Sequence, residues 1–234
     1  MSGTLYGVGL GPGDPELITL KAARLIGAAK VLAWPAPEEG DSLARRIAVE
    51  LIPKGAREIA IRLPMRAESR DPAQAAYDRG ATEIAAVLET GEDVVCLCEG
   101  DPMFYGSFMY LFARLSARFP VEIVPGVTSV SAASARARHP LAARDQAIHV
   151  LPAPLSDAEL AERIAGGGTI ALMKLGRHAG RVKALVAELG LLDHAVYVER
   201  ATWPDERILP LAEAPEAAPY FSLALISGGR DPWL

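Results

Sequence analysis

Short β-branched and apolar runs alternate with amphipathic stretches through the first half of the chain. Five of these runs have the length and the residue types of strands, over residues 4–10, 30–34, 57–63, 93–98 and 121–124. Amphipathic segments separate most of them, so the repeating unit is strand, helix, strand. This repetition predicts a largely parallel sheet in the first half of the chain.

Two helices of the first half have marked ends. Asp14 can cap free backbone amides and Pro15 suits a first helical position, which predicts a helix that begins there. Four of its apolar residues then fall on one face: Ile18, Ala22, Leu25 and Ala29. The second helix, over residues 73–90, is expected to end at Gly91, because glycine readily takes the left-handed conformation that terminates helices.

The second half of the chain has a different pattern of predicted strands and helices. Its strand-like runs cover residues 147–151, 169–174, 195–200, 208–211 and 221–226. Helices are expected only over residues 156–164, where Ser156 and Glu159 have the spacing of a capping box, and over residues 180–189. Fewer crossover helices favour a mixed sheet. With Pro125-Gly126 between the two patterns, we expect an N-terminal domain of residues 1–125 and a C-terminal domain of residues 126–234.

Composition and charge narrow the class of protein. Half of the 234 residues are apolar, enough for one large core or two compact ones. With 29 acidic and 24 basic residues the formal net charge is −5, the opposite of what a binder of nucleic-acid phosphates needs. The amino terminus does not resemble a secretory leader, and no apolar run approaches the roughly 18 residues of a membrane span. We therefore predict a cytoplasmic protein that binds neither nucleic acid nor membrane.

The cysteines give no sign of a metal site or a disulfide. Cys96 and Cys98 are two apart in a predicted strand, so both side chains project from one face. The histidines are scattered along the sequence, at positions 139, 149, 178 and 194, whereas zinc needs clustered ligands. We expect two buried thiols and no bound metal.

A glycine-rich run follows the first strand, Gly7-Val8-Gly9-Leu10-Gly11-Pro12-Gly13-Asp14-Pro15, and lets the backbone approach a ligand closely. It fails the dinucleotide pattern G-x-G-x-x-G, because Pro12 or Asp14 falls where the last glycine belongs. No phosphate-binding G-x-x-x-x-G-K-[ST] is present either. The glycine loop of an ordinary Rossmann-type methyltransferase and a tight turn without a ligand remain as alternatives for this run.

Two further motifs follow later strands. Glu99-Gly100-Asp101-Pro102-Met103-Phe104-Tyr105-Gly106-Ser107 comes after the fourth strand and repeats the Gly-Asp-Pro of the first motif. Val124-Pro125-Gly126-Val127-Thr128-Ser129 comes at the end of the fifth. Ligands of open α/β sheets bind at the carboxyl edge of the strands, so three such turns favour a common binding site.

With these three motifs the chain resembles the tetrapyrrole methylase family over nearly its whole length. The resemblance implies two α/β domains, a mainly parallel N-terminal sheet, a mixed C-terminal sheet and an active site in the cleft between the domains. It also implies S-adenosylmethionine as methyl donor, S-adenosylhomocysteine as product, and a homodimer. Residues 99–111, 173–177 and 197–202 look most like the subfamily that methylates C-20 of precorrin-2, giving precorrin-3A in cobalamin biosynthesis.

Alternatives within and outside the family stay open. The substrate of such a subfamily member is precorrin-2 or its cobalt complex, and we expect the metal-free form. Members of the same family that methylate rRNA or diphthine share the Gly-Asp-Pro turns. A sensor that binds the cofactor without catalysis is the alternative outside enzymes.

Carried over residue by residue, the family pattern places eight residues of this chain near the cofactor: Pro12, Gly100, Asp101, Phe104, Thr128, Ser129, Met173 and Ala201. Asp101 can accept hydrogen bonds and Met173 offers a polarizable surface to a purine. A helix cap is the alternative role for Asp101, and core packing is the alternative for Met173.

Methyl transfer needs alignment of donor and acceptor more than it needs a base. A proton must leave the ring afterwards, and Asp101, Tyr105 or Lys174 could assist, so no catalytic residue is assigned. Arginines and lysines suit the carboxylates of such a substrate, and two groups follow the predicted motifs: Arg136, Arg138 and Arg144, then Lys174, Arg177 and Arg181.

Overall fold

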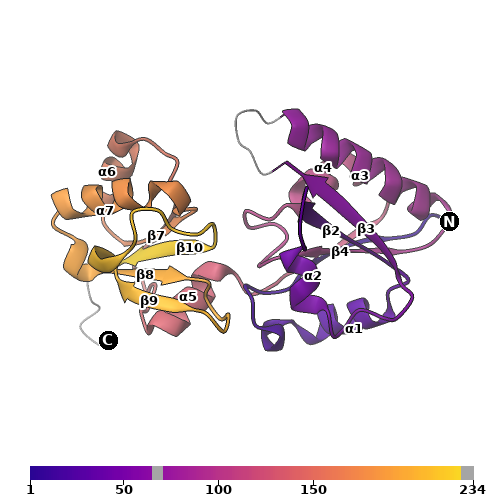
Figure 1. The fold of residues 1–234 in the computed structure, drawn as a ribbon, viewed down its shortest axis with the longest axis horizontal. Coiled ribbons are helices and arrows are strands. Elements are labelled where there is room, and N and C mark those ends of the chain that lie inside the picture. Colours follow the sequence, from indigo (N-terminus) through magenta and orange to yellow (C-terminus); the bar gives the residue numbers. More distant parts are fainter. Residues whose placement is uncertain (65–70, 228–234) are drawn as a thin grey trace. The chain divides into compact units, whose positions relative to one another are not determined.

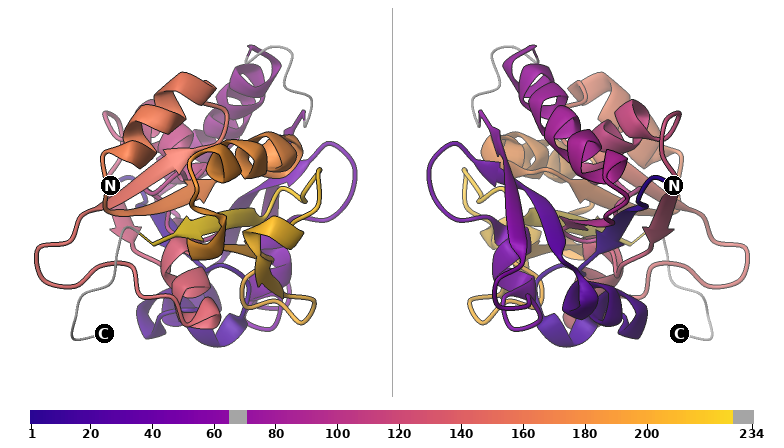
Figure 2. Two further views of the ribbon diagram at one scale, coloured as in Figure 1. Left: turned by 90° about the vertical axis from the view of Figure 1, so that its left-hand side faces the viewer. Right: turned by 90° about the vertical axis from the view of Figure 1, so that its right-hand side faces the viewer.

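The computed structural model describes residues 1–64 and 71–227. The chain folds into two compact units, Met1–Thr128 and Ser129–Leu234. The boundary expected between residues 125 and 126 falls just inside the first unit. Figure 1 shows both units as sheets covered by helices, and Figure 2 gives two further views of these layers.

The first unit is built on a parallel sheet with strand order β3-β2-β4-β1-β5. Its strands are β1 (Leu5–Gly9), β2 (Val31–Pro37), β3 (Arg57–Leu63), β4 (Val94–Cys98) and β5 (Val121–Val124). All five agree with the predicted runs to within a few residues, and the parallel arrangement is confirmed. Because every strand runs in the same direction, the bends that follow β1, β4 and β5 lie at one edge of the sheet.

Helices cover both faces of this sheet (Figure 1). They are α1 (Leu20–Ala28), α2 (Leu43–Ala48), α3 (Asp71–Glu89) and α4 (Phe108–Leu115). Cys96 and Cys98 share one face, packed in the core with residues of α3 and α4, whereas Val95 and Leu97 are buried on the other. Burial on both sides is typical of a parallel sheet and explains why β4 is uniformly apolar. Both thiols are free, and burial raises the pKa of Cys98 to about 11.

The first helix begins later than its sequence signal indicates. The Asp14 carboxylate accepts the Glu16 N–H at 2.9 Å and caps only a short 3-10 turn, Pro15–Leu17. The chain is extended at Ile18, and the Thr19 hydroxyl then caps α1 through the Ala22 N–H at 3.2 Å. The prediction was wrong here because two capping residues occur within six positions, and the first of them caps only the turn.

Two helices of the first unit were not predicted. The six residues of α2 are too few to show a helical period. In α4 the run Phe108-Met109-Tyr110-Leu111-Phe112 is apolar almost throughout, which hides the period, although Phe108, Leu111 and Leu115 alone are buried. The expected helix over residues 73–90 is confirmed as α3, and Gly91 after it has a left-handed φ of 90°.

The second unit has a mixed sheet of order β6-β7-β10-β8-β9, as expected. Its strands are β6 (Ile148–Pro152), β7 (Thr169–Met173), β8 (Ala195–Glu199), β9 (Arg207–Pro210) and β10 (Ser222–Ile226). Only β6 and β7 pair in parallel, and the other pairs are antiparallel. Since β10 is antiparallel to both of its neighbours, β7 and β8 run in the same direction on either side of it.

Within the described residues, the second unit has three α-helices: α5 (Ser129–Ala137), α6 (Asp157–Ala165) and α7 (Ala179–Glu188). The predicted capping box is present, because the Ser156 side chain accepts the Glu159 N–H and the Glu159 carboxylate accepts the Ser156 N–H. Helices α6 and α7 pack on the face of the sheet that carries Leu172 and Ala224. The small residues of α5 gave no clear apolar period, and this helix, which contacts β8 and β10, was not predicted.

In the part of the chain that the structure describes, no helix has both the length and the apolar character needed to cross a bilayer.

Candidate functional site

The bends after β1 and β4 are joined through their backbones. Gly11 and Gly100 form an isolated antiparallel bridge, in which the Gly11 N–H donates to the Gly100 carbonyl at 3.2 Å and the Gly100 N–H donates to the Gly11 carbonyl at 2.8 Å. Both residues have left-handed φ values, 77° and 64°. Only glycine takes this conformation without steric cost, which is why the two motifs carry glycine at these positions.

The bend after β5 packs directly against the other two. A Cβ atom on Gly9 would lie 2.6 Å from the Gly126 nitrogen and 2.7 Å from the Gly100 oxygen, and one on Gly126 would lie 2.1 Å from the Gly100 oxygen. Side chains cannot fit at these separations. The three sequence motifs therefore converge on one junction at the carboxyl edge of the first sheet, formed by Gly9, Gly11, Gly100 and Gly126, which we call the glycine junction.

Asp101 ties the glycine junction together with its carboxylate. Its Oδ1 accepts the Met103 N–H at 2.9 Å, and its Oδ2 accepts the Gly126 N–H at 3.0 Å. The first bond caps a turn and not the helix considered from the sequence, since α4 begins after Ser107, whereas the second links the bend after β4 to the bend after β5. Each carboxylate oxygen has a second lone pair, so these bonds leave Asp101 able to accept a hydrogen bond from a ligand.

Beyond Asp101 the chain turns tightly into α4. A Cβ atom on Gly106 would lie 2.5 Å from the Pro102 oxygen and 2.6 Å from the Asp101 oxygen, so only glycine fits there. Tyr105 has a left-handed φ of 56° and is exposed, and its ring meets the Phe104 ring edge to face at 5.3 Å. This turn places both aromatic rings directly after the Gly-Asp-Pro motif, in contact with each other.

Glu99 directly precedes Gly100, and its structural role was missed in the sequence. Its Oε1 accepts the Ala44 N–H at 3.0 Å, which connects the end of β4 to the first turn of α2. Burial raises the pKa of this carboxyl, against the effect of hydrogen bonds from its own N–H and from Ala44. Its position next to Gly100 was the only available signal, and an acidic residue there has many other possible roles.

In the second unit, Met173 and Ala201 lie at corresponding strand ends. Met173 is the last residue of β7, where its carbonyl accepts the Ala153 N–H at 2.8 Å. Ala201 follows β8 by two residues and is buried. Because β7 and β8 run in the same direction, both residues are at one edge of the second sheet. Met173 is only partly buried and is not a member of the core beneath α6 and α7.

Backbone strain marks the same strand ends. Six non-glycine residues of the described chain have left-handed φ values. Three follow β7 or β8 closely, Lys174 (59°), Arg200 (48°) and Thr202 (72°), and Tyr105 (56°) lies in the turn between β4 and α4. Such residues concentrate at binding and catalytic sites, where the surrounding structure holds them in place. Nothing in the sequence indicates them, since the usual signal for this conformation is glycine.

The predicted cofactor residues are divided between the units. The first unit contains Pro12, Gly100, Asp101, Phe104 and Thr128. Gly100 is part of the glycine junction, and Asp101 is hydrogen-bonded to it. Ser129, as the first residue of α5, belongs to the second with Met173 and Ala201.

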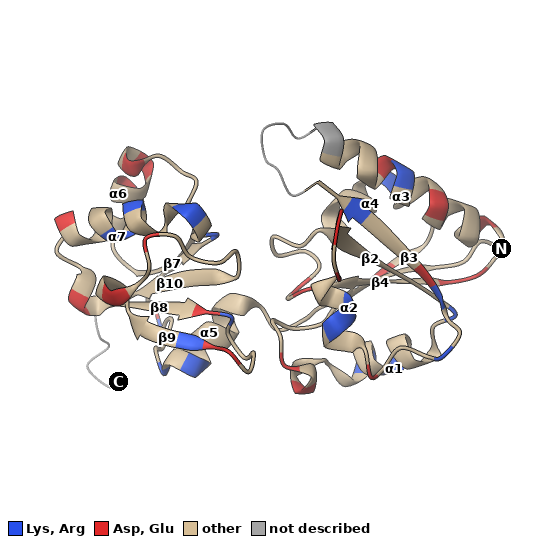
Figure 3. Cartoon of the chain, in the orientation of Figure 1, with Lys and Arg blue, Asp and Glu red and all other residues tan. Residues whose placement is uncertain are grey.

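The basic residues expected to bind carboxylates have different environments. Arg136 is paired with Glu206, and Arg181 is paired with Asp157 and donates to the Leu155 carbonyl at 3.0 Å. Within the described residues, no ion pair involves Arg138, Arg144 or Arg177, and all three are exposed. Figure 3 shows basic and acidic positions interspersed over both units. The three arginines without an ion pair are the better candidates for a carboxylate-bearing ligand.

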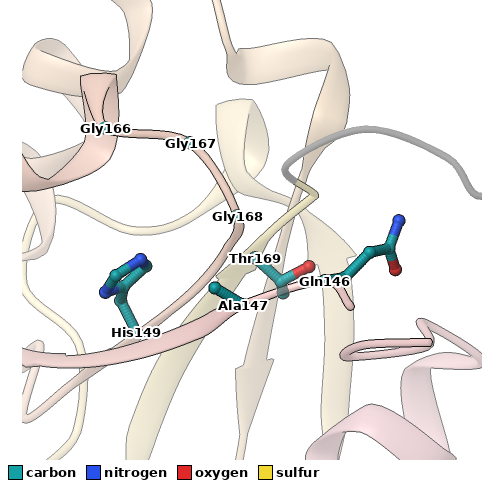
Figure 4. A pocket seen from close by; sticks show the side chains of 7 residues that line it. All are labelled: Gln146, Ala147, His149, Gly166, Gly167, Gly168 and Thr169. Carbon is teal, nitrogen blue, oxygen red and sulfur yellow. The ribbon is translucent and has the colours of Figure 1, made fainter. Parts of the chain in front are cut away.

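Two hollows of the second unit lie at the opposite edge of its sheet from Met173 and Ala201. The smaller, about 190 Å³, lies where β6 and β7 begin, and Figure 4 shows the glycines at 166–168 running beside Ala147 and His149. The larger, about 590 Å³, includes Ser227, whose Oγ is 3.0 Å from His139 Nε2. Neither hollow contains a predicted cofactor residue.

Together, the fold and the glycine junction define an α/β protein whose three motif bends meet at the carboxyl edge of its parallel sheet, and solved structures share its architecture. Cobalt precorrin-4 methyltransferase CbiF is similar with a TM-score of 0.70 and 28% identity over 96% of this chain and 94% of that one. A uroporphyrin-III C-methyltransferase from Thermus thermophilus, solved with S-adenosylhomocysteine, has a TM-score of 0.67 and 25% identity over 96% and 92%.

Residues 4–215 match the family model of Tetrapyrrole (Corrin/Porphyrin) Methylases, so the chain belongs to this family. Members of the family use S-adenosylmethionine. The resemblance noted from the three motifs and the two-sheet fold class are thereby confirmed.

Curated relatives extend the similarity. The cobalamin biosynthesis protein CobIJ of Mycobacterium tuberculosis is 47% identical over 97% of this chain, which spans only 46% of that protein. Precorrin-2 C(20)-methyltransferase of a Sinorhizobium species is 41% identical over 98% of this chain and 97% of its own. Cobalt-precorrin-2 C(20)-methyltransferase of Salmonella typhimurium is 35% identical, over 97% of each.

Proposed function

We propose that this chain transfers a methyl group from S-adenosylmethionine to C-20 of precorrin-2, giving precorrin-3A in cobalamin biosynthesis. Family membership supports the class of reaction, and the relatives that match over nearly their whole length support the position methylated. The greater identity to the Sinorhizobium protein than to the Salmonella protein favours the metal-free ring over its cobalt complex.

The glycine junction is the observation that carries this proposal. Three backbone bends from separate strands meet where open α/β sheets bind ligands. At Gly100 the space on the Cβ side is open, since the nearest neighbour of a Cβ atom there is the Val127 oxygen at 4.0 Å. A ligand can therefore approach the Gly100 backbone closely, as a small polar cofactor requires.

In this proposal the eight residues of the family pattern contact the cofactor. Pro12 lies beside the cofactor, Gly100, Asp101 and Phe104 surround its methionine and ribose portions, and Thr128 and Ser129 lie near the methionine end. Met173 and Ala201 lie near the adenine. S-adenosylmethionine supplies an electrophilic methyl group when bound, and the protein's part is to align the acceptor carbon and to exclude water.

The chain's own residues can also take part after methyl transfer. The meso carbon must lose a proton, and Asp101 retains free lone pairs after accepting two backbone N–H groups. Tyr105 is exposed on the same turn. Arg138, Arg144 and Arg177 can pair with substrate carboxylates, for which the planar guanidinium suits bidentate contact.

The decisive experiment is incubation of the purified protein with S-adenosylmethionine and freshly prepared precorrin-2, with and without cobalt. We expect mass spectrometry to show one added methyl group, and NMR with a labelled methyl group to place it on C-20. Faster turnover without cobalt supports the metal-free substrate. A methyl group on a pyrrole carbon, or turnover only of rRNA or diphthine in parallel assays, would overturn the assignment.

We further propose a cytoplasmic homodimer, as is usual for the family. Light scattering after size-exclusion chromatography should give twice the chain mass, and a monomer mass would contradict it. Fluorescent tagging in the source cell tests the compartment.

A further inference from the structure

The bend after β8 has an unusual backbone. Arg200 and Thr202 both have left-handed φ values, 48° and 72°, on either side of the buried Ala201. Left-handed φ is strongly disfavoured for a β-branched residue such as threonine, because its side chain crowds the backbone. A conformation of this kind persists only where surrounding contacts hold it.

Glu206 supplies such a contact. Its Oε2 accepts the Thr202 N–H at 2.6 Å. The neighbouring N–H groups bond instead to main-chain carbonyls: Arg200 to Phe221 at 2.8 Å, Trp203 to Arg200 at 3.0 Å and Glu206 to Trp203 at 3.1 Å. The turn is therefore formed by backbone bonds, whereas the Thr202 amide is bound by a side chain that a substitution can remove.

Arg136 holds the Glu206 carboxylate in place from α5. Its Nε donates to the two carboxylate oxygens at 2.8 and 3.0 Å, and only 10% of the Glu206 side chain is exposed. Burial opposes ionisation of Glu206, but the bonds from Arg136 and from the Thr202 N–H outweigh it and lower its pKa. The carboxylate is therefore charged at neutral pH, which makes both hydrogen bonds charge-assisted.

We propose that Glu206, oriented by Arg136, is a positioning residue that fixes the left-handed bend at residues 200–202 and so places Ala201 for contact with the adenine of the cofactor. This inference rests on the proposed function, in which Ala201 lies at the cofactor. Neither residue needs to touch the cofactor or the substrate. Their effect passes through the backbone of Thr202.

The test is a double-mutant cycle between Glu206 and Thr202. E206A removes the acceptor, and we expect the dissociation constant for S-adenosylhomocysteine, measured by calorimetry, to rise about tenfold. E206Q keeps an acceptor oxygen and should raise the dissociation constant by less than about threefold. In T202G/E206A the loss should largely disappear, since glycine takes a left-handed φ without help from Glu206. Rescue by glycine distinguishes positioning of the bend from a general loss of stability.

One further measurement and two further variants complete the design. Hydrogen exchange at the Thr202 amide should accelerate in E206A, and E89A, which breaks the exposed Arg118–Glu89 pair of the first unit, serves as the matched control with unchanged affinity. If E206A does not fold, R136M takes its place, because it leaves the acceptor but removes the cation that orients it, and T202G should again restore affinity.

Wild-type affinity in E206A, or failure of T202G to rescue a folded E206A, overturns the inference while the proposed function stands. If the wild-type chain does not bind S-adenosylhomocysteine at all, the proposed function fails and the inference fails with it.

Discussion

Asp101 and Gly126 are 25 positions apart in the chain, and the carboxylate of the first accepts the backbone N–H of the second at 3.0 Å. This bond crosses from the bend after β4 to the bend after β5. Since a second oxygen of the same carboxylate caps the turn toward α4, one side chain links two proposed cofactor-binding segments.

Replacement of Asp101 tests what its two hydrogen bonds contribute to stability and to binding. D101A leaves the Gly126 and Met103 N–H groups without this acceptor, so we expect a loss of about 1–3 kcal/mol in the free energy of unfolding and weaker binding of S-adenosylhomocysteine. D101N keeps one acceptor oxygen, so its stability and its affinity should lie between those of wild type and D101A. Urea unfolding and calorimetry measure the two effects, with E162A on the exposed side of α6 as a control for loss of an acidic residue. Unchanged values for D101A would show that the carboxylate contributes to neither.

The glycine junction predicts a strong contrast between two glycine-to-alanine substitutions. In G126A the new Cβ atom would be 2.1 Å from the Gly100 oxygen, so the bends must separate, at a cost of about 1–3 kcal/mol or more. In G27A the Cβ atom of a helical residue in α1 meets nothing within 4 Å, and alanine should stabilise the protein by about 0.5–1 kcal/mol. Thermal and urea unfolding of both variants test this. Equal effects would contradict the close packing.

Glu99 should make stability fall with increasing pH. Burial raises the pKa of its carboxyl in the folded state, so the unfolded chain ionises first as pH rises. The contribution of Glu99 to the free energy of unfolding is therefore fully present below the ordinary carboxyl pKa of about 4.3. It is lost as the pH rises through the pKa of Glu99 in the folded state. E99Q cannot ionise, and its stability relative to wild type should increase as the pH rises above the ordinary carboxyl pKa of about 4.3. Urea unfolding across this range measures the difference, and a constant difference would show that burial does not shift Glu99.

The capping box of α6 provides a test that is independent of the proposed site. S156A removes the hydroxyl that accepts the Glu159 N–H and should lower the free energy of unfolding by about 1 kcal/mol. S156D, which retains a capping oxygen, should stay close to wild type. Hydrogen bonds from the Ser156 side chain and backbone also lower the pKa of Glu159, so an NMR titration of S156A should show that pKa moving back up. If S156A and S156D are equally stable, the hydroxyl is not an effective cap.

Much of the fold could be predicted from the sequence. All ten strands that the structure describes were predicted, because short β-branched runs between glycine and proline residues have few alternatives to a buried strand. The helices that were missed, α2, α4 and α5, are short, apolar almost throughout or rich in small residues, and each lacks the apolar period on which prediction depends. Thr19 shows a further limit, since the sequence analysis named only Asp14 as a cap, whereas Asp14 caps the 3-10 turn and Thr19 caps α1.

The sequence by itself determined the strands, the two kinds of sheet and the glycine bends, because these follow from residues within a few positions of each other. Only the tertiary structure decided which side chain meets which backbone amide. Arg136 and Glu206 are 70 positions apart, and Glu99 and Ala44 are 55 apart, so no local pattern connects them. Such pairs exist because the order of strands brings distant segments together, and buried polar groups must then find partners among whatever lies beside them.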